Sequence, residues 1–268
     1  MAIDSDLIRL TNEKLFNPWI KVSPRSQDGW IKDGVDPATI LDCPDIPGIT
    51  KIRITDSEVW LGIDIGHSPD PTSVAVVKHL RLTSTYNHNQ SRNSQEFVTS
   101  FYRVTRCKEW SGVAYPDQRG LVQEVLNEEL DYNKTVSIVC DGTGVGKAVG
   151  QDWQSGLTGY SQFFPVTMVY GEPRSLNSMA VSDLILNTQA AFEQGRVSLP
   201  RSNSDFAIRK LHHQLTTRGI ETDFRGRLRA IDERKSGLNH YDLSVALSLV
   251  VGHNERITST YQPFKWVC

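Results

Sequence analysis

Three aspartates stand at the ends of apolar segments that lie far apart in the sequence. Asp64 closes the apolar run that begins at Val59, Asp141 follows the apolar stretch 135–140, and Asp242 opens the apolar segment that continues to His253. A buried carboxylate is costly unless it binds a cation or is fully hydrogen-bonded. Mg²⁺ and Mn²⁺ prefer oxygen ligands, and a pair of such ions can activate water and stabilise a leaving oxygen. The pattern indicates a two-metal site for phosphoryl transfer to water.

Each aspartate also has an ordinary structural interpretation. Asp64 can initiate the turn that follows a strand, whereas Asp141 and Asp242 can cap the helices that come after them. Carboxylates crowded at one place repel one another unless metal ions are bound. The metal-site interpretation therefore requires a fold that brings these three positions together.

Apolar periodicity predicts the elements that would position the acids. The expected strands and helices are a hairpin of strands over 61–65 and 74–77, a polar loop over 84–95, a strand over 97–105, a helix over 117–130, a strand over 135–140, a glycine-rich turn over 141–147, a helix over 148–154, a strand over 163–170, a helix over 177–194, a strand over 197–200, a helix over 204–215, a β-hairpin over 216–231 and a helix over 243–253. Strand hairpins come first and strand–helix units later, which favours an α/β fold with a mixed sheet.

Composition narrows the class of protein. The chain has 268 residues and a formal net charge of -2. The overall charge therefore gives no indication of a nucleic-acid partner, although a local basic patch can still bind one. Its four scattered cysteines contain no CxxC pair, which argues against a zinc ribbon or a disulfide framework. The sequence carries neither a membrane-spanning apolar run nor a signal peptide, so we expect a soluble intracellular protein without a membrane partner. Residues 1–55 are rich in proline and charge and are predicted to form an extension or linker, and 56–268 the main domain.

The glycine-rich turn invites comparison with a phosphate-binding loop. Asp141-Gly-Thr-Gly-Val-Gly-Lys-Ala departs from that motif at both ends, because Asp141 would add negative charge near phosphates and Ala148 lacks the hydroxyl that holds Mg²⁺. The glycines let the backbone turn sharply from strand to helix. Lys147 is then either a DNA contact or a surface residue of the first helical turn.

Several motifs together resemble a known family. Gly62-Ile-Asp-Ile-Gly with Asp70 close behind, Val139-Cys-Asp-Gly-Thr-Gly-Val-Gly and His240-Tyr-Asp-Leu-Ser-Val-Ala-Leu are similar in order and spacing to the nuclease domain of the large terminase subunit of tailed bacteriophages. The segment from Ala190 to Pro200 is also similar to that family's segment between its second and third acids. The resemblance covers about residues 58–253.

This resemblance implies an RNase H-like α/β fold, with a central mixed β-sheet flanked by helices and an added β-hairpin. It implies an endonuclease that cuts double-stranded DNA during genome packaging, with Asp64, Asp141 and Asp242 as ligands of Mg²⁺ or Mn²⁺. Asp70 matches a further acid of the family and is either another ligand or a turn former between prolines. The implied partners are a packaging ATPase domain, a small terminase subunit and a portal protein, at the procapsid motor in the host cytoplasm.

The chain also departs from the family pattern. Tyr241 occupies a place where many members carry an acid, and no credible Walker A motif precedes the nuclease region. We therefore expect an excised domain, a split gene product or a stand-alone relative.

Basic residues gather in the stretch 201–235, which carries nine lysines and arginines against five acids. Arg225, Arg227 and Arg229 alternate, so on a strand they share one face. With Arg218, Lys147 and His240 they are candidate DNA contacts, mainly to phosphates. A solvated hairpin explains the arginines equally well, and His240 can be a metal ligand, a DNA contact or a loop histidine.

Two other functions fit parts of the pattern. Actin-like and sugar-kinase-like ATPases also begin with a Gly-Ile-Asp-Ile-Gly hairpin, although here His67-Ser-Pro-Asp follows in place of a phosphate-binding Thr or Ser. A catalytically weak domain that docks on a portal protein is the non-enzymatic alternative. Measurable ATP binding would favour the first, and tight portal binding without DNA cleavage would favour the second.

Overall fold

The structure is a computed structural model of the whole chain. The residues it describes are 7–8, 40–41, 49–66, 70–87, 94–133, 135–173, 175, 177–194, 196–200, 205–217, 220–222, 228–230 and 241–261. None of the helices in these ranges is long and apolar enough to cross a membrane.

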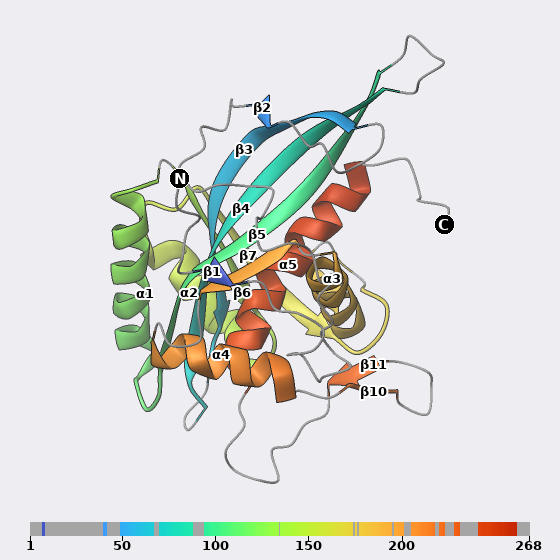
Figure 1. Cartoon of the computed structure of the whole chain (residues 1–268). Coiled ribbons are helices and arrows are strands. Elements are labelled where there is room, and N and C mark those ends of the chain that lie inside the picture. Colours follow the sequence, from blue (N-terminus) through green and yellow to red (C-terminus); the bar gives the residue numbers. More distant parts are fainter. Residues whose placement is uncertain are drawn as a thin grey trace.

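The elements alternate between strands and helices after an initial run of strands (Figure 1). Their bounds are β1 Leu7–Ile8, β2 Ile40–Leu41, β3 Ile49–Asp64, β4 Thr72–Asn87, β5 Ser94–Trp110, α1 Tyr115–Leu130, β6 Val136–Asp141, α2 Val145–Gly156, β7 Gln162–Val169, β8 Ser178–Ala180, α3 Val181–Glu193, β9 Val197–Pro200, α4 Phe206–Thr217, β10 Ile220–Thr222, β11 Leu228–Ala230 and α5 Asp242–Tyr261.

One mixed sheet runs in the order β1-β9-β5-β4-β3-β6-β7-β8. β5, β4 and β3 form an antiparallel meander, and β6, β7 and β8 continue from β3 in parallel. β10 and β11 form a separate antiparallel hairpin. The expected α/β arrangement is observed, with a mixed sheet flanked by helices and an added hairpin.

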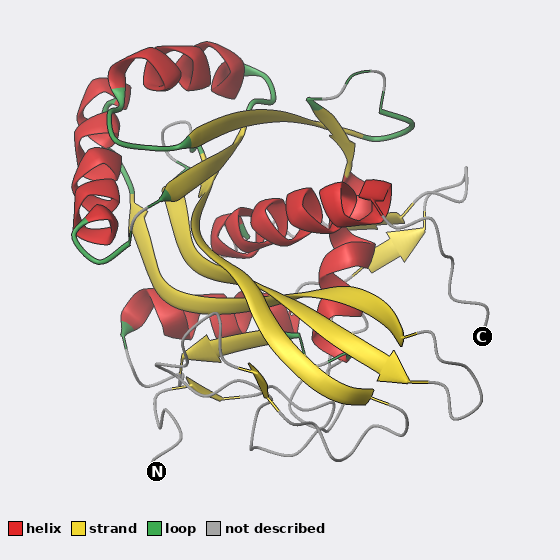
Figure 2. Ribbon diagram, turned by 90° about the horizontal axis from the view of Figure 1, so that it is seen from above, coloured by secondary structure: helices red, strands yellow, loops and turns green. Residues whose placement is uncertain are grey.

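Alternate residues of the central strands face two different hydrophobic cores. Trp60 and Val139 belong to the core beneath α3, α4 and α5, whereas Leu61 and Ile138 belong to the core beneath α1 and α2. Because successive side chains of a strand point to opposite faces, both faces of β3 and β6 must be apolar. Figure 2 shows the helices on both sides of the strongly curved sheet.

Some elements differ from the sequence-based expectation. The polar stretch 84–95 was expected as a loop, yet β4 continues to Asn87 and β5 begins at Ser94. Thr83, Thr85 and Tyr86 explain the longer strand, since β-branched and aromatic residues fit a pleated surface even where they are not apolar. The helix expected from residue 177 begins at Val181 because 178–180 pair with β7.

Gly62 is the point at which α5 comes closest to the central strand. A Cβ at this position would lie 2.0 Å from the carbonyl oxygen of Ala246 and 2.7 Å from Cγ2 of Val250. The absence of a side chain therefore allows the helix backbone to rest directly on β3. This contact fixes the depth at which α5 packs on the sheet.

We expect Gly62→Ala to destabilise the fold by about 1–3 kcal/mol, the usual cost of an overpacked core. Urea unfolding of the purified protein measures the change. Gly120→Ala is the matched control, because Gly120 lies within α1 and a Cβ there meets nothing within 4 Å. That substitution should stabilise the protein by about 0.5–1 kcal/mol. An equal effect of the two substitutions would contradict the close approach of α5.

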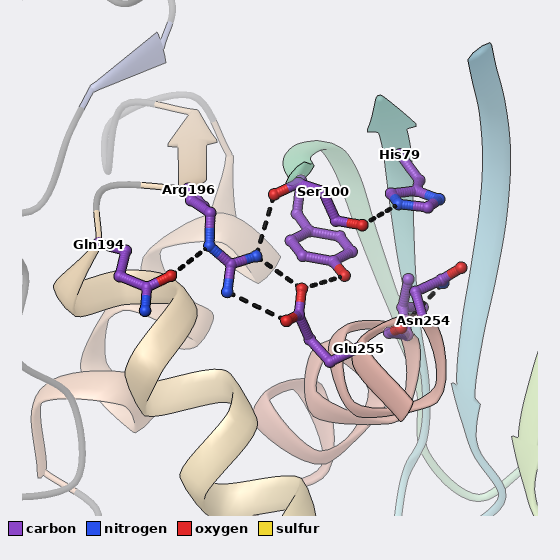
Figure 3. A network of polar contacts seen from close by, with 8 residues as sticks. His79, Ser100, Gln194, Arg196, Asn254 and Glu255 are labelled. Carbon is purple, nitrogen blue, oxygen red and sulfur yellow. Dashed lines mark hydrogen bonds and ion pairs between the residues drawn. The ribbon is translucent and has the colours of Figure 1, made fainter. Parts of the chain in front are cut away.

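A buried polar network ties the C-terminal half of α5 to β5 and to the end of α3 (Figure 3). Arg196 donates two hydrogen bonds to the carboxylate of Glu255, at 2.6 and 3.1 Å, and a third to the carbonyl of Ser100 at 3.0 Å. The hydroxyl of Tyr102 donates to the same Glu255 carboxylate at 2.7 Å. A carboxylate with three such donors holds α5 at a fixed position along the sheet.

One buried and one half-buried histidine make the stability of the fold depend on pH. His79 stacks on Tyr102 with a centroid distance of 5.1 Å, and His253 packs against Phe164 at 4.4 Å. Burial, aided by Arg81 and Arg196, lowers the pKa of His79 to about 3, and burial with Arg256 lowers the pKa of His253 to about 4. Both imidazoles are therefore neutral in the folded protein at neutral pH.

We expect the free energy of unfolding to fall as the pH drops from about 6.5 toward 4. In this window the unfolded chain protonates both histidines, near their usual pKa of about 6.5, while the folded protein does not. Each imidazole contributes a slope of up to about 1.4 kcal/mol per pH unit. Urea unfolding at several pH values gives the slope, and His253→Phe, which keeps the aromatic packing, should reduce it. An unchanged slope in that variant would rule out His253 as a source.

Candidate active site

Asp64 is the last residue of β3, and a chain of hydrogen bonds holds the backbone at Gly66, two residues after it. The amide of Gly66 donates to Oγ1 of Thr72 at 3.0 Å, and that hydroxyl donates to Oε1 of Gln118 at 2.8 Å. Gln118 Nε2 donates in turn to the carbonyl of Val113 at 2.7 Å. Thr72 and Gln118 are buried, so the turn after Asp64 is anchored to the start of α1.

Asp141 is the last residue of β6 and lies beside Asp64. Ile63 pairs with Cys140 on the parallel strands, so the two aspartates occupy the next positions of neighbouring strands. Asp64 lies two residues after Gly62, which faces α5, and Asp141 lies two residues after Val139, which belongs to the core beneath α5. Because the side-chain period of a strand is two, both aspartates belong to the face that α5 covers.

The carboxyl group of Asp141 is half-buried and held by the glycine-rich turn. Its Oδ1 accepts a hydrogen bond from the amide of Thr143 at 2.7 Å. Burial raises the pKa of Asp141, although hydrogen bonds from Thr143 act in the opposite direction. The alternative that Asp141 caps the next helix is not observed, because α2 has Gly144 at its N-cap and no side-chain cap bond.

Asp242 lies in the first turn of α5, and α5 runs antiparallel to β3. His253 contacts the ring of Trp60 at a centroid distance of 5.4 Å, and Ala246 lies against Gly62. Asp242 lies one helical turn before Ala246 on α5. Asp64 lies two residues after Gly62 on β3. Oδ2 of Asp242 is buried. The first turn of α5 thus lies toward the strand ends that carry the other two aspartates.

The fold therefore places all three predicted aspartates toward one end of one face of the sheet. Among the described side chains, no group of three or more His, Cys, Asp or Glu residues is arranged to hold a metal ion. Asp70 lies half-buried between β3 and β4, where its carbonyl approaches the Cα of Gly66. Lys147 is exposed in the first turn of α2, which fits a surface lysine and a DNA contact equally.

Most of the predicted DNA contacts lie outside the described residues. This holds for Arg218, Arg225, Arg227 and His240. Arg229 belongs to β11, where it pairs with Glu221 of β10, so the predicted hairpin is confirmed between 220 and 230.

Sequence reasoning missed the polar residues that surround the aspartates. Ser73 pairs with Asp64 across β3 and β4, and Glu109 pairs with Ser73 across β4 and β5. Lys210 of α4 contacts both carboxylate oxygens of Glu109 at 2.7 Å. No local signal marks Glu109, because it lies 36 positions from Ser73 and 101 positions from Lys210 in the sequence.

No protein-family model matches the chain, and no curated protein matches its sequence significantly.

Solved structures with a similar fold exist. The nuclease domain of the large terminase subunit gp2 of bacterial virus Sf6 has a TM-score of 0.42 and 14% identity, covering 73% of this chain and 86% of that chain. A K428A mutant of that domain with manganese has a TM-score of 0.45 and 13% identity, with 73% and 87% coverage. RuvC of Thermus thermophilus has a TM-score of 0.32 and 9% identity, covering 75% of this chain and 96% of that one.

Proposed function

We propose that the chain is a divalent-metal-dependent endonuclease that cuts double-stranded DNA. The proposal rests chiefly on one observation: Asp64 and Asp141 end neighbouring parallel strands on the face covered by α5, whose first turn carries Asp242. Carboxylate oxygens supplied by three separate elements near one end of a sheet are suited to hold hard cations once they are drawn together around them.

The chemistry of these residues fits Mg²⁺ or Mn²⁺. All three candidate ligands supply carboxylate oxygens, and burial makes the negative charge of Asp141 costly in the absence of a cation. When bound, the ions would supply Lewis-acid stabilisation of phosphate charge and lower the pKa of water.

The surrounding residues hold the three carboxylates in place. The amide of Thr143 restrains Oδ1 of Asp141, and the bonds from Gly66 through Thr72 to Gln118 fix the backbone that follows Asp64. The contact between Gly62 and Ala246 sets the depth of α5 and with it the depth of Asp242. Asp70 would act as a further ligand or as a support for the turn.

DNA would be held mainly through its phosphates by the arginines of the predicted hairpin region, Arg218, Arg225, Arg227 and Arg229, together with Lys147 and His240. Contacts of this kind give binding that weakens steeply with salt and tolerates many sequences. Such tolerance suits a cut that is made during packaging rather than at one fixed site.

The sequence motifs further suggest a place in phage genome packaging. In this role the domain would act with a packaging ATPase, a small terminase subunit and a portal protein, at the procapsid motor in the host cytoplasm. The support for this part is the order of motifs around Asp64, Asp141 and Asp242.

Cleavage of supercoiled plasmid by the purified protein tests the proposal. We expect nicked and linear products with MnCl2 or MgCl2, and none when EDTA is present. Intact plasmid under every divalent metal would refute the nuclease assignment. Titration calorimetry with ATP in parallel separates the ATPase alternative, which predicts measurable binding where the nuclease predicts none.

A further inference from the structure

Helix α4 carries two polar side chains one turn apart that reach opposite sides of the candidate site. Lys210 Nζ lies 2.7 Å from each carboxylate oxygen of Glu109 on β5. Oε1 of Gln214 accepts a hydrogen bond from the backbone amide of Ser244 at 2.9 Å. Residues four apart on a helix share a face, so one side of α4 contacts both places.

The contact of Gln214 fixes the start of α5. Ser244 lies two residues after Asp242, and the first amides of a helix have no acceptor within their own helix. Gln214 is 2% exposed, so its amide group is a fixed acceptor supplied by a neighbouring helix. The hydroxyl of Ser244 also donates to the carbonyl of Tyr241 at 2.7 Å. The first turn of α5 is therefore tied to α4 at a defined position.

The contact of Lys210 fixes the strands beside Asp64. Glu109 pairs with Ser73, and Ser73 pairs with Asp64, so these three residues form a row across β5, β4 and β3. The hydroxyl of Ser73 donates to Oε1 of Glu109 at 3.2 Å, and Ser73 is fully buried. Lys210 binds Glu109, which is the residue of this row that lies on β5.

Packing alone does not account for these two contacts. The apolar residues Ile208, Leu211 and Leu215 of α4 are almost completely buried and attach the helix to the core. Apolar contacts tolerate small shifts and rotations, whereas a hydrogen bond to one backbone amide and a two-oxygen ion pair set direction and distance. The polar contacts therefore fix the position of α4 more precisely than the burial of its apolar side chains does.

We propose that α4 is a strut that sets the spacing between Asp64 and Asp242, with Gln214 as the principal positioning residue and Lys210 as its second support. This inference rests on the proposed metal-dependent nuclease. The bond of Gln214 to the amide of Ser244 lies in the first turn of α5, and its effect on metal binding would pass through that turn.

Metal binding by the Gln214→Leu variant tests the strut. Titration calorimetry with MnCl2 should show an affinity about 10-fold to 100-fold weaker than that of the natural protein, as is usual when support for a ligand is lost. Lys210→Met should weaken Mn²⁺ binding in the same direction. Ile208→Val is the matched control, because it weakens packing of the same helix without touching either polar contact, and its Mn²⁺ affinity should stay unchanged. Unchanged affinity in Gln214→Leu, or an equal loss in the control, would overturn the proposal.

Hydrogen exchange in the metal-free protein supplies a second readout. The amide of Ser244 should exchange faster in Gln214→Leu and at the natural rate in Ile208→Val. Unchanged exchange would overturn the strut whether or not metal binds. If the natural protein neither binds Mn²⁺ nor cuts DNA but exchange responds as expected, the nuclease proposal fails while Gln214 remains the residue that positions α5.

Discussion

Asp64→Asn is expected to lower metal-dependent DNA cleavage by about a thousandfold or more. The substitution keeps the size of the side chain and removes the charge that would hold the cation. The ions contribute several kcal/mol to stabilising the transition state, and each 1.36 kcal/mol corresponds to a factor of ten in rate. Initial rates of plasmid nicking at saturating MnCl2 measure the loss.

Asp117→Asn is the control for this prediction. Asp117 is an exposed acid in the first turn of α1, on the other face of the sheet from α5. Its replacement should leave the nicking rate unchanged. Activity within a few-fold of the natural protein in Asp64→Asn would show that the carboxylate of Asp64 does not take part in the reaction.

The largest expected effect on stability comes from Glu255→Ala. This change leaves the guanidinium of Arg196 buried without its carboxylate, and it removes the acceptor of Tyr102. Breaking one partner of a buried ion pair costs about 3–5 kcal/mol. The side chain of Glu255 is 20% exposed, so we expect a value of about 3 kcal/mol, at the low end of that range. Urea unfolding at pH 7 measures it.

The double variant Arg196→Met, Glu255→Leu separates the two parts of this cost. It removes both charges and should be less destabilised than Glu255→Ala alone, because no unpaired buried charge remains. If the double variant were much less stable than Glu255→Ala, the introduced Met and Leu side chains would not fill the space left by Arg196 and Glu255. A loss of under 1 kcal/mol in Glu255→Ala would contradict the role of the network in holding α5.

The central elements of the fold could be predicted because their apolar patterns are strong. The runs before Asp64 and Asp141 are buried on both faces, and the apolar stretch after Asp242 forms a helix that is buried for most of its length. The strand extensions could not be predicted in the same way. Residues 82–87 of β4 are mostly polar, and their pairing with residues 94–99 of β5 decides their structure.

The candidate site was accessible to sequence reasoning only in part. Carboxylates at the ends of apolar segments can be seen directly, and the pairing of Ile63 with Cys140 explains why two of them are neighbours. Gln118, Lys210 and Gln214 could not be identified, because each acts through a partner that is distant in the sequence. A glutamine within a helical pattern looks like any surface residue until the neighbouring helix is known.

Anomalous diffraction from crystals soaked in MnCl2 tests the central claim most directly. We expect a manganese peak at the ends of β3 and β6, bound by carboxylate oxygens of Asp64, Asp141 and Asp242. A manganese peak elsewhere, or carboxylates that stay apart and bind nothing at saturating manganese, would contradict it.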